Sequence, residues 1–179
     1  MGIRWVAARL AQGLGWMSLL AALGCGGGSD APPLPSAEQL VEIAVAVDAA
    51  MGSEDAKLGA PRSKFGLLDS PTTLYREDGT QLRMYTKPRA PVSLFGKRFA
   101  ITLGFDRREV LRRIEYRSRD LDRKGCIEAG YELGLAYGLP SPEADGSQVW
   151  RGEKVYVRWS FADELREKTC LITWDLVVP

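Results

Sequence analysis

The amino-acid sequence predicts an α+β fold: an antiparallel sheet of about five to seven strands, with two helices packed on one face and one disulfide. Two stretches, at residues 36–52 and 125–138, have apolar side chains at helical spacing and end in glycine. Runs that alternate apolar with polar residues, separated by turn residues, indicate strands of which one face is buried. Two cysteines, Cys126 and Cys170, lie on the expected core faces.

The first 24 residues differ in composition from the rest of the chain. They contain Arg4 and Arg9 but no acidic residue, and residues 10–24 carry no charge. A positive start followed by a short apolar segment is typical of a secretory signal peptide. An uncharged segment of about 15 residues is too short for the roughly 20 helical residues that cross a bilayer. We therefore expect residues 1–24 to be a cleaved signal rather than a membrane-spanning helix.

The junction that follows, Ala22-Leu23-Gly24-Cys25, resembles the lipobox of bacterial lipoproteins. The resemblance covers only the first 30 residues, and the leucine and the small residue before the glycine stand in exchanged order relative to the commonest lipobox. It implies that Cys25 receives a diacylglyceryl group, becomes the new N-terminus and is acylated, as with palmitate, on its amine. The alternative is an ordinary secretory signal cleaved near Gly24, with Cys25 as a free thiol.

The residues after Cys25 bear on where the protein is anchored. Gly26 follows the cysteine in place of the aspartate that tends to retain lipoproteins in the inner membrane, so the resemblance implies export to the outer membrane, facing the periplasm. Two or more acyl chains hold a protein stably on a bilayer. Residues 25–35, rich in glycine and proline, predict a flexible tether with a reach of roughly 17 Å. Residues 36–179 then form a single domain of ordinary size.

The first predicted helix begins after Ser36, an N-cap whose capping-box partner is Gln39. Its apolar residues recur at helical spacing, and Gly52 ends it. We expect this apolar stripe to pack on the domain's own sheet. The alternative is an amphipathic helix that binds a partner.

The predicted strands follow a loop at residues 53–70 that contains a short helical turn. Asp78-Gly79 supplies the turn of a first hairpin, and the clearest alternation surrounds Ile101 and Leu103. In the second half, a polar loop around residue 145 precedes three further strands, with a turn expected at 161–165. The predicted strands are at residues 72–76, 81–86, 99–105, 110–117, 149–151, 155–159 and 170–176.

The second predicted helix lies within residues 125–140 and carries Gly130 and Gly134 on the same face as Cys126. Glycine costs roughly 1 kcal/mol in a helix interior, so this face is expected to approach the sheet closely. In an oxidising compartment, Cys126 and Cys170 form a disulfide that closes a loop of about 45 residues, worth about 4 kcal/mol in the chain-entropy model. The alternative is a pair of buried free thiols.

Composition excludes several classes of function. The chain contains no histidine, which removes Ser-His-Asp and Cys-His catalysis and histidine-ligated zinc. With 24 basic and 23 acidic residues, its near-neutral charge argues against nucleic acid as a partner. No nucleotide-binding or dithiol motif is present, and Asp120 and Asp122 lack the rest of a calcium loop. The sequence therefore indicates no cofactor, no metal site and no catalytic residue.

A run of arginines is the remaining candidate site: Arg107, Arg108, Arg112, Arg113 and Arg117. Such a patch would suit lipid phosphates or an acidic partner, although cross-strand ion pairs on a solvated strand face are the commoner interpretation. We therefore expect a lipid-anchored envelope protein of structural or partner-binding type, held to the membrane by its acyl chains. The alternative is a histidine-independent envelope hydrolase that uses carboxylates as acid and base.

Overall fold

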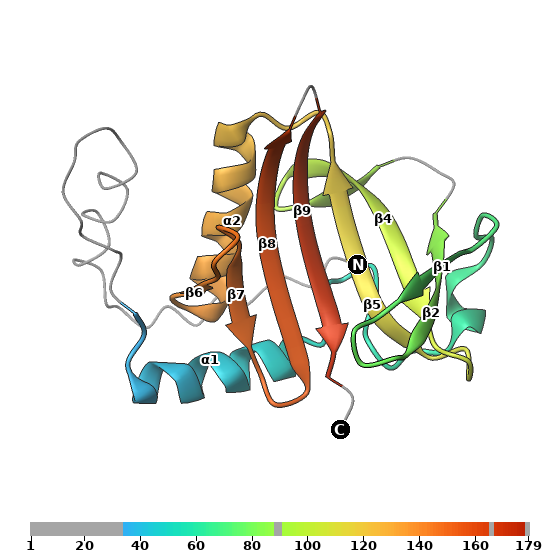
Figure 1. Ribbon diagram of the computed structural model, residues 1–179, viewed down its shortest axis with the longest axis horizontal. Helices are drawn as coiled ribbons and strands as arrows, with labels where there is room; N and C mark the ends of the chain where they lie inside the picture. Colours follow the sequence, from blue (N-terminus) through green and yellow to red (C-terminus); the bar gives the residue numbers. More distant parts are fainter. Residues whose placement is uncertain (1–33, 88–90, 165–166, 178–179) are drawn as a thin grey trace, which may run out of the picture. The chain divides into compact units, whose positions relative to one another are not determined.

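The computed structural model describes residues 34–87, 91–164 and 167–177 of the 179-residue chain. The predicted signal, Cys25 and most of the tether lie outside these residues. Residues 34–179 form one compact unit. Its elements (Figure 1) are, in order, α1 (Ala37–Ala50), η3 (Arg62–Phe65), β1 (Thr72–Tyr75), β2 (Gln81–Thr86), β3 (Val92–Leu94), β4 (Lys97–Phe105), β5 (Leu111–Ser118), α2 (Arg123–Tyr137), β6 (Ser141–Pro142), β7 (Gln148–Arg151), β8 (Val155–Glu164) and β9 (Glu167–Leu176).

All strands belong to one antiparallel sheet, in the order β1-β2-β4-β5-β9-β8-β7-β6, with β3 paired to β4. After β5 the chain leaves the sheet to form α2, and it returns through β6, β7 and β8 before β9 pairs with β5. The α+β class is confirmed. The sheet has nine strands, more than the predicted five to seven, because β3 and β6 contain three and two residues and are too short to show alternation.

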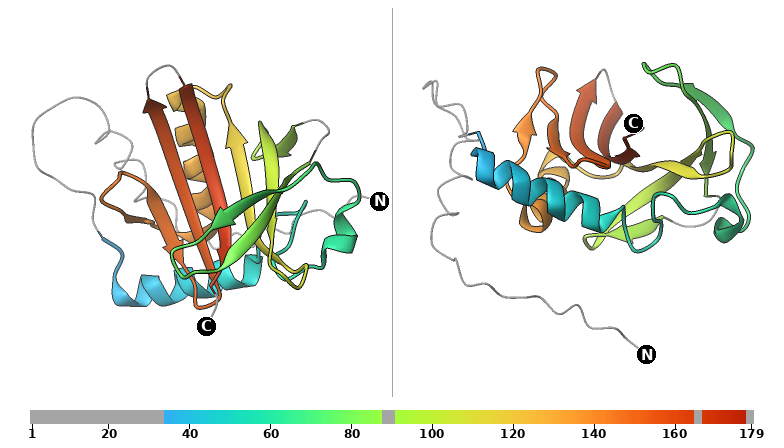
Figure 2. Two further views of the ribbon diagram at one scale, coloured as in Figure 1. Left: turned by 45° about the vertical axis from the view of Figure 1, so that its right-hand side comes forward. Right: turned by 90° about the horizontal axis from the view of Figure 1, so that it is seen from below.

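One face of the sheet is apolar, and both helices lie on it (Figure 2). Its core side chains include Phe99 from β4, Tyr116 from β5 and Trp174 from β9, all at most 1% exposed. Alternate residues of each strand point to this face, as the sequence pattern predicts. The described residues therefore form one hydrophobic core between helices and sheet.

Helix α1 begins with the predicted capping box between Ser36 and Gln39. Ile43 and Val47 are buried in the core, so the helix packs on its own sheet. Asp48 accepts hydrogen bonds of 2.9 Å from three successive backbone N–H groups, at residues 153–155, and so joins α1 to the β7–β8 turn. Three apolar side chains of α1 remain exposed: Leu40, Val41 and Val45.

Helix α2 begins at Arg123, capped by Asp122, and is joined to β9 by the predicted disulfide. The Sγ atoms of Cys126 and Cys170 are 1.98 Å apart, which confirms the pairing. Gly130 contacts the indole ring of Trp159, as expected for a close approach, whereas a Cβ at Gly134 would meet no atom within 4 Å. Only the first of the two glycines is therefore required by packing.

The predicted turn at residues 161–165 is wrong for residues 161–164, because β8 continues to Glu164. Phe161 pairs with Cys170, and Ala162 pairs with Thr169. Polar residues such as Asp163 are common in turns, so the sequence pattern predicts the end of this strand too early. The longer β8–β9 ladder places Trp159 and Phe161 against the core.

The pairing of β4 with β5 shifts register between Gly104 and Phe105, as at a β-bulge, which bends a strand. A Cβ at Gly104 would lie 2.6 Å from Met84 Sδ and 3.1 Å from Arg113 Cβ. This close approach lets Leu82 and Met84 of β2 become buried on the sheet face opposite the helices. The β1–β2 hairpin therefore crosses in front of that face (Figure 1).

Candidate functional site

The face of the sheet that points away from the helices is polar and charged. It carries Arg113 and Glu115 on β5, Asp175 on β9, and Tyr156 and Arg158 on β8. Neither α1 nor α2 covers it, since both lie on the other side of the sheet (Figure 2). We call it the open face.

A first ion-pair cluster on the open face is centred on Arg113. Its Nη1 donates to Asp175 Oδ2 at 2.8 Å, and its Nη2 lies 3.6 Å from Glu115 Oε2. Glu115 also accepts a hydrogen bond of 2.8 Å from Arg117 Nη2. The side chains of Asp175 and Glu115 are only 8% and 13% exposed. Two largely buried carboxylates thus converge on one guanidinium.

This cluster contains buried polar atoms without partners in the described structure: Arg113 Nε, Asp175 Oδ1 and Arg76 Nη1. Burial raises the pKa of Asp175 above its ordinary value, although Arg113 and Arg76 act to lower it. Desolvation of the carboxylate therefore outweighs its ion pair. A buried polar atom that lacks a hydrogen bond costs about 1–3 kcal/mol, so this cluster lowers the stability of the fold.

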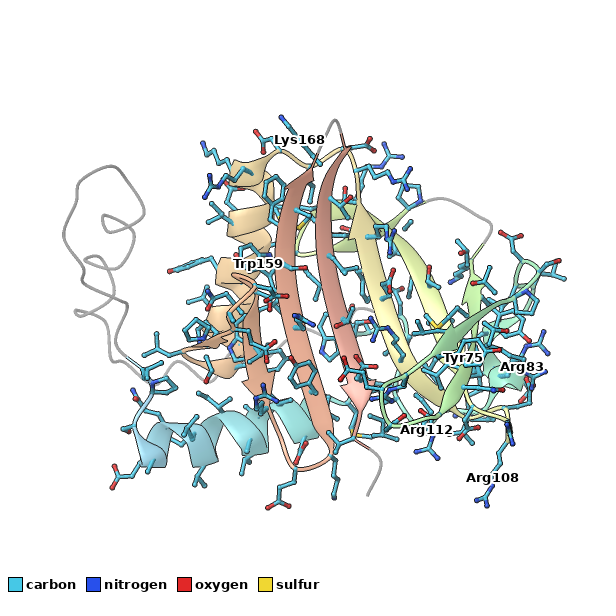
Figure 3. All side chains as sticks on the ribbon, in the orientation of Figure 1. Tyr75, Arg83, Arg108, Arg112, Trp159 and Lys168 are labelled. Atoms are coloured by element: carbon cyan, nitrogen blue, oxygen red, sulfur yellow. A yellow bond between two sulfur atoms is a disulfide. The ribbon has the colours of Figure 1, made fainter. Side chains whose placement is uncertain are left out.

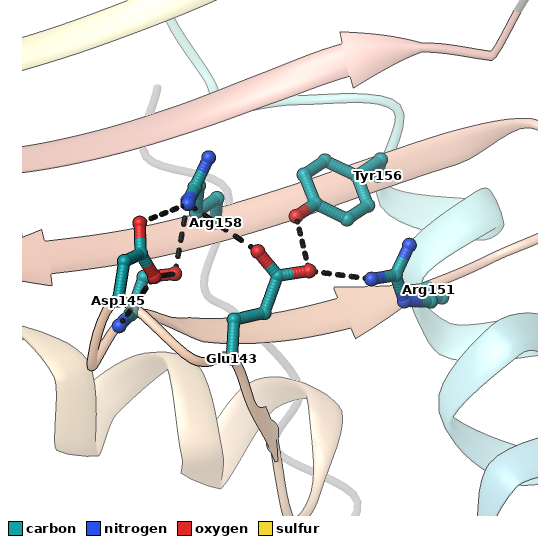
Figure 4. Close-up of polar contacts among 6 residues, drawn as sticks. Glu143, Asp145, Arg151, Tyr156 and Arg158 are labelled. Atoms are coloured by element: carbon teal, nitrogen blue, oxygen red, sulfur yellow. Dashed lines mark hydrogen bonds and ion pairs between the residues drawn. The ribbon is translucent and has the colours of Figure 1, made fainter.

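A second cluster lies beside the first, where β7 and β8 meet the β6–β7 turn (Figure 4). Glu143 accepts from Arg151 Nη2 at 2.5 Å and from the Tyr156 hydroxyl at 3.2 Å. Arg158 contacts Glu143 and Asp145, and its Nε donates to Ser147 Oγ at 3.0 Å. This network fixes the orientation of Arg158 on the open face.

Two pKa values in the second cluster shift in opposite directions. Hydrogen bonds from Ser147, with the nearby Arg158 charge, lower the pKa of Asp145. Burial, and secondarily the charge of Glu143, raises the pKa of Tyr156. At neutral pH Asp145 is therefore ionised and Tyr156 keeps its proton, so that the tyrosine hydroxyl remains a hydrogen-bond donor.

A hollow of about 250 Å³ lies between the two clusters. Its lining combines two cations, two hydroxyls, one carboxylate and one apolar side chain, from Arg113, Arg158, Ser160, Thr173, Asp145 and Leu171. Because the hollow offers both donors and acceptors, it suits a polar ligand or a polar segment of a partner.

The five predicted patch arginines fall into two groups. Arg113 and Arg117 lie on the open face and are ion-paired there. Arg107 and Arg108 are in the β4–β5 turn, and Arg112 follows at the start of β5. Arg112 Nε donates to Asp106 Oδ2 at 2.7 Å, whereas in the described part of the chain no ion-pair partner faces Arg108.

Two more arginines lie beside the β4–β5 turn, and both contact Glu109, which lies between them. Arg83 Nη2 contacts Glu109 Oε1, and Arg62 Nε lies 3.5 Å from Oε2 of the same carboxylate. The Arg62 guanidinium also stacks over the Tyr85 ring, 4.6 Å from its centre. We call Arg62, Arg83, Arg107, Arg108 and Arg112 the basic end; Figure 3 shows three of them together. Sequence reasoning missed Arg62 and Arg83 because they come from separate segments.

Comparisons with known proteins do not identify a family for this chain. No family model, no curated protein and no solved structure matches this chain. Across residues 34–87, 91–164 and 167–177, no group of three or more cysteine, aspartate or glutamate side chains is placed to hold a metal ion. In the same residues, neither α1 nor α2 is long and apolar enough to cross a membrane.

Proposed function

We propose that this chain is an exported lipoprotein, anchored through Cys25 and facing the periplasm from the outer membrane, whose domain binds an envelope partner through its open face. The lipobox-like Ala22-Leu23-Gly24-Cys25 supports the anchor. The Cys126–Cys170 disulfide is consistent with an oxidising compartment. Roughly ten residues between Cys25 and α1 keep the domain near the bilayer.

The observation that carries the binding proposal is the hollow on the open face, which is lined by two guanidinium groups, two hydroxyls and one carboxylate. Arg158 of this lining is held in place by Asp145 and Ser147. Buried polar groups in folded proteins are normally hydrogen-bonded. A partner that fills the hollow would bury this lining and would have to supply matching donors and acceptors, so it would gain specificity because a poorly matched partner leaves them unsatisfied.

Replacing Cys25→Ser should release the protein from the membrane fraction, because serine provides no thiol for lipid attachment and nothing else is proposed to hold the domain there. Fractionation of cells into soluble and membrane extracts, with immunoblotting of the chain, measures this. A variant whose signal is cleaved and which nevertheless stays with the membranes would contradict the anchor. Ser29→Ala is the matched control, since it changes a residue next to the junction and leaves the thiol of Cys25 in place.

A photo-crosslinking residue at Ser160, which lines the hollow, should give a discrete adduct with an envelope protein. The same residue at Glu132, exposed on α2 on the far side of the sheet, should give none. The measurement is a shifted band in crosslinked envelopes, identified by mass spectrometry. Equal adducts at both positions, or none at Ser160, would count against open-face binding.

A histidine-independent hydrolase is the second candidate, and one observation favours it. Burial raises the pKa of Asp175, and Glu115 contacts the same arginine, so a carboxyl that favours its protonated form lies beside a second carboxyl group. Because the folded pKa of Asp175 is raised, the protonated acid, and any activity that depends on it, would decline as pH rises through that pKa. An empty crosslinking result together with a hydrolytic activity lost in Asp175→Asn would replace the binding proposal with this one.

A further inference from the structure

The basic end is a second surface, separate from the open face, with a surplus of positive charge. Its five arginines are accompanied by two carboxylates, Asp106 and Glu109, both already engaged. Asp106 accepts from Arg112 and from the backbone N–H groups of Arg108 and Val110. Glu109 is held between two guanidinium groups. The remaining surplus of three charges is presented to solvent, with Arg107 and Arg108 exposed at the tip of the turn.

A hollow of about 310 Å³ lies at this end, between the β1–β2 hairpin and the β4–β5 turn. Its lining is formed by Thr73, Gln81, Arg83, Asp106 and Arg107. Thr73 and Arg83 are paired across the hairpin, as are Tyr75 and Gln81, so these four side chains share one hairpin face. Tyr75 is 71% exposed beside this hollow. The surface thus combines guanidinium groups with an amide, a hydroxyl and an accessible aromatic ring.

The basic end lies far from the start of α1, where the tether enters the domain. Helix α1, where the tether enters the domain, begins at the opposite end of the ribbon from the β4–β5 turn (Figures 1 and 2). The predicted tether is flexible and lets the domain turn, so the choice between a lipid and a polypeptide follows from the chemistry of the surface. Guanidinium groups recognise carboxylates in pairs, and exposed tyrosine with amide side chains suits an extended polypeptide.

We propose that the basic end binds an acidic segment of a partner polypeptide, whose carboxylates lie over Arg83, Arg107 and Arg108. The inference goes beyond the proposed function, because it gives a partner chemistry to a second surface whose residues differ from those of the open face. Binding of this kind is driven mainly by charge, so it accelerates association and is weakened by salt.

The test measures binding of a fluorescent octaglutamate peptide to the full chain as isolated from cells, by fluorescence anisotropy. Arg107→Gln combined with Arg108→Gln should weaken binding by about tenfold, as expected for two exposed charge pairs. The control removes two charges elsewhere, with Arg123→Gln and Lys124→Gln at the exposed start of α2, and should leave binding within about twofold. Raising the salt from about 0.05 M to about 0.5 M should abolish most of the signal.

Three results would overturn the inference. The first is no salt-sensitive binding of octaglutamate, and the second is an equal loss in both double variants. The third is preferential binding of phosphatidylglycerol vesicles over the peptide, which would assign the basic end to a lipid surface. Each of these leaves crosslinking at Ser160 unaffected, so failure here is distinguishable from failure of open-face binding. Circular dichroism of both double variants confirms that the fold is retained.

Discussion

Replacing Cys126 and Cys170 together with alanine should lower the free energy of unfolding by about 4 kcal/mol. The disulfide links residues 44 positions apart, and in the chain-entropy model a loop of this length stabilises by that amount through restriction of the unfolded chain. Both side chains are fully buried between α2 and β9. Urea unfolding followed by circular dichroism measures the difference between the oxidised protein and the double variant.

Reduction of the wild-type protein is the control for this prediction, because it opens the same loop without changing the sequence. Reduced protein and double variant should unfold at similar urea concentrations, both well below the oxidised protein. Peptide mapping without reductant should recover residues 126 and 170 in one linked fragment. Recovery of both as alkylated thiols from native, oxidised protein would refute the pairing.

The substitution Gly130→Leu should destabilise the domain by about 1–3 kcal/mol through overpacking. Even a Cβ at residue 130 would lie 2.9 Å from Trp159 Cε2. The indole cannot easily move aside, because its Nε1 donates a hydrogen bond of 3.0 Å to the Cys126 carbonyl on the same helix. Thermal unfolding monitored by circular dichroism should show a lower melting temperature.

Gly134→Leu is the matched control, four residues further along α2. A Cβ there meets no atom within 4 Å, so the new side chain has room. Removal of a helical glycine should then raise stability by up to about 1 kcal/mol. An unchanged melting temperature in Gly130→Leu, or equal losses in both variants, would show that the face bearing Gly130 does not pack on β8.

Much of the fold could be predicted because its signals are local. The capping box at Ser36 and Gln39 marks the start of α1, and the alternation around Ile101 and Leu103 reflects a strand with one face in the core. The disulfide was predictable because the two cysteines lie on apolar faces of their elements. The same reasoning failed for β3 and β6, where two or three residues cannot display a period of two.

The charged surfaces depend on register and topology, which the sequence pattern does not specify. Arg113 meets Asp175 because β9 pairs with β5, although the two residues are 62 positions apart. Arg62 and Arg83 reach Glu109 only because η3 and the β1–β2 hairpin both pack beside the β4–β5 turn. A run of arginines is visible in the sequence, but its division into an ion-paired open face and a basic end follows from the folded structure.

The central claim is that this is a lipid-anchored domain. The most direct test of it is the intact mass of the protein extracted from cell membranes. Our proposal predicts a chain that begins at Cys25, with added mass for a diacylglyceryl group and an amide-linked acyl chain, and with residues 1–24 removed. A chain that starts at any other residue, or that carries an unmodified Cys25, would contradict the proposal.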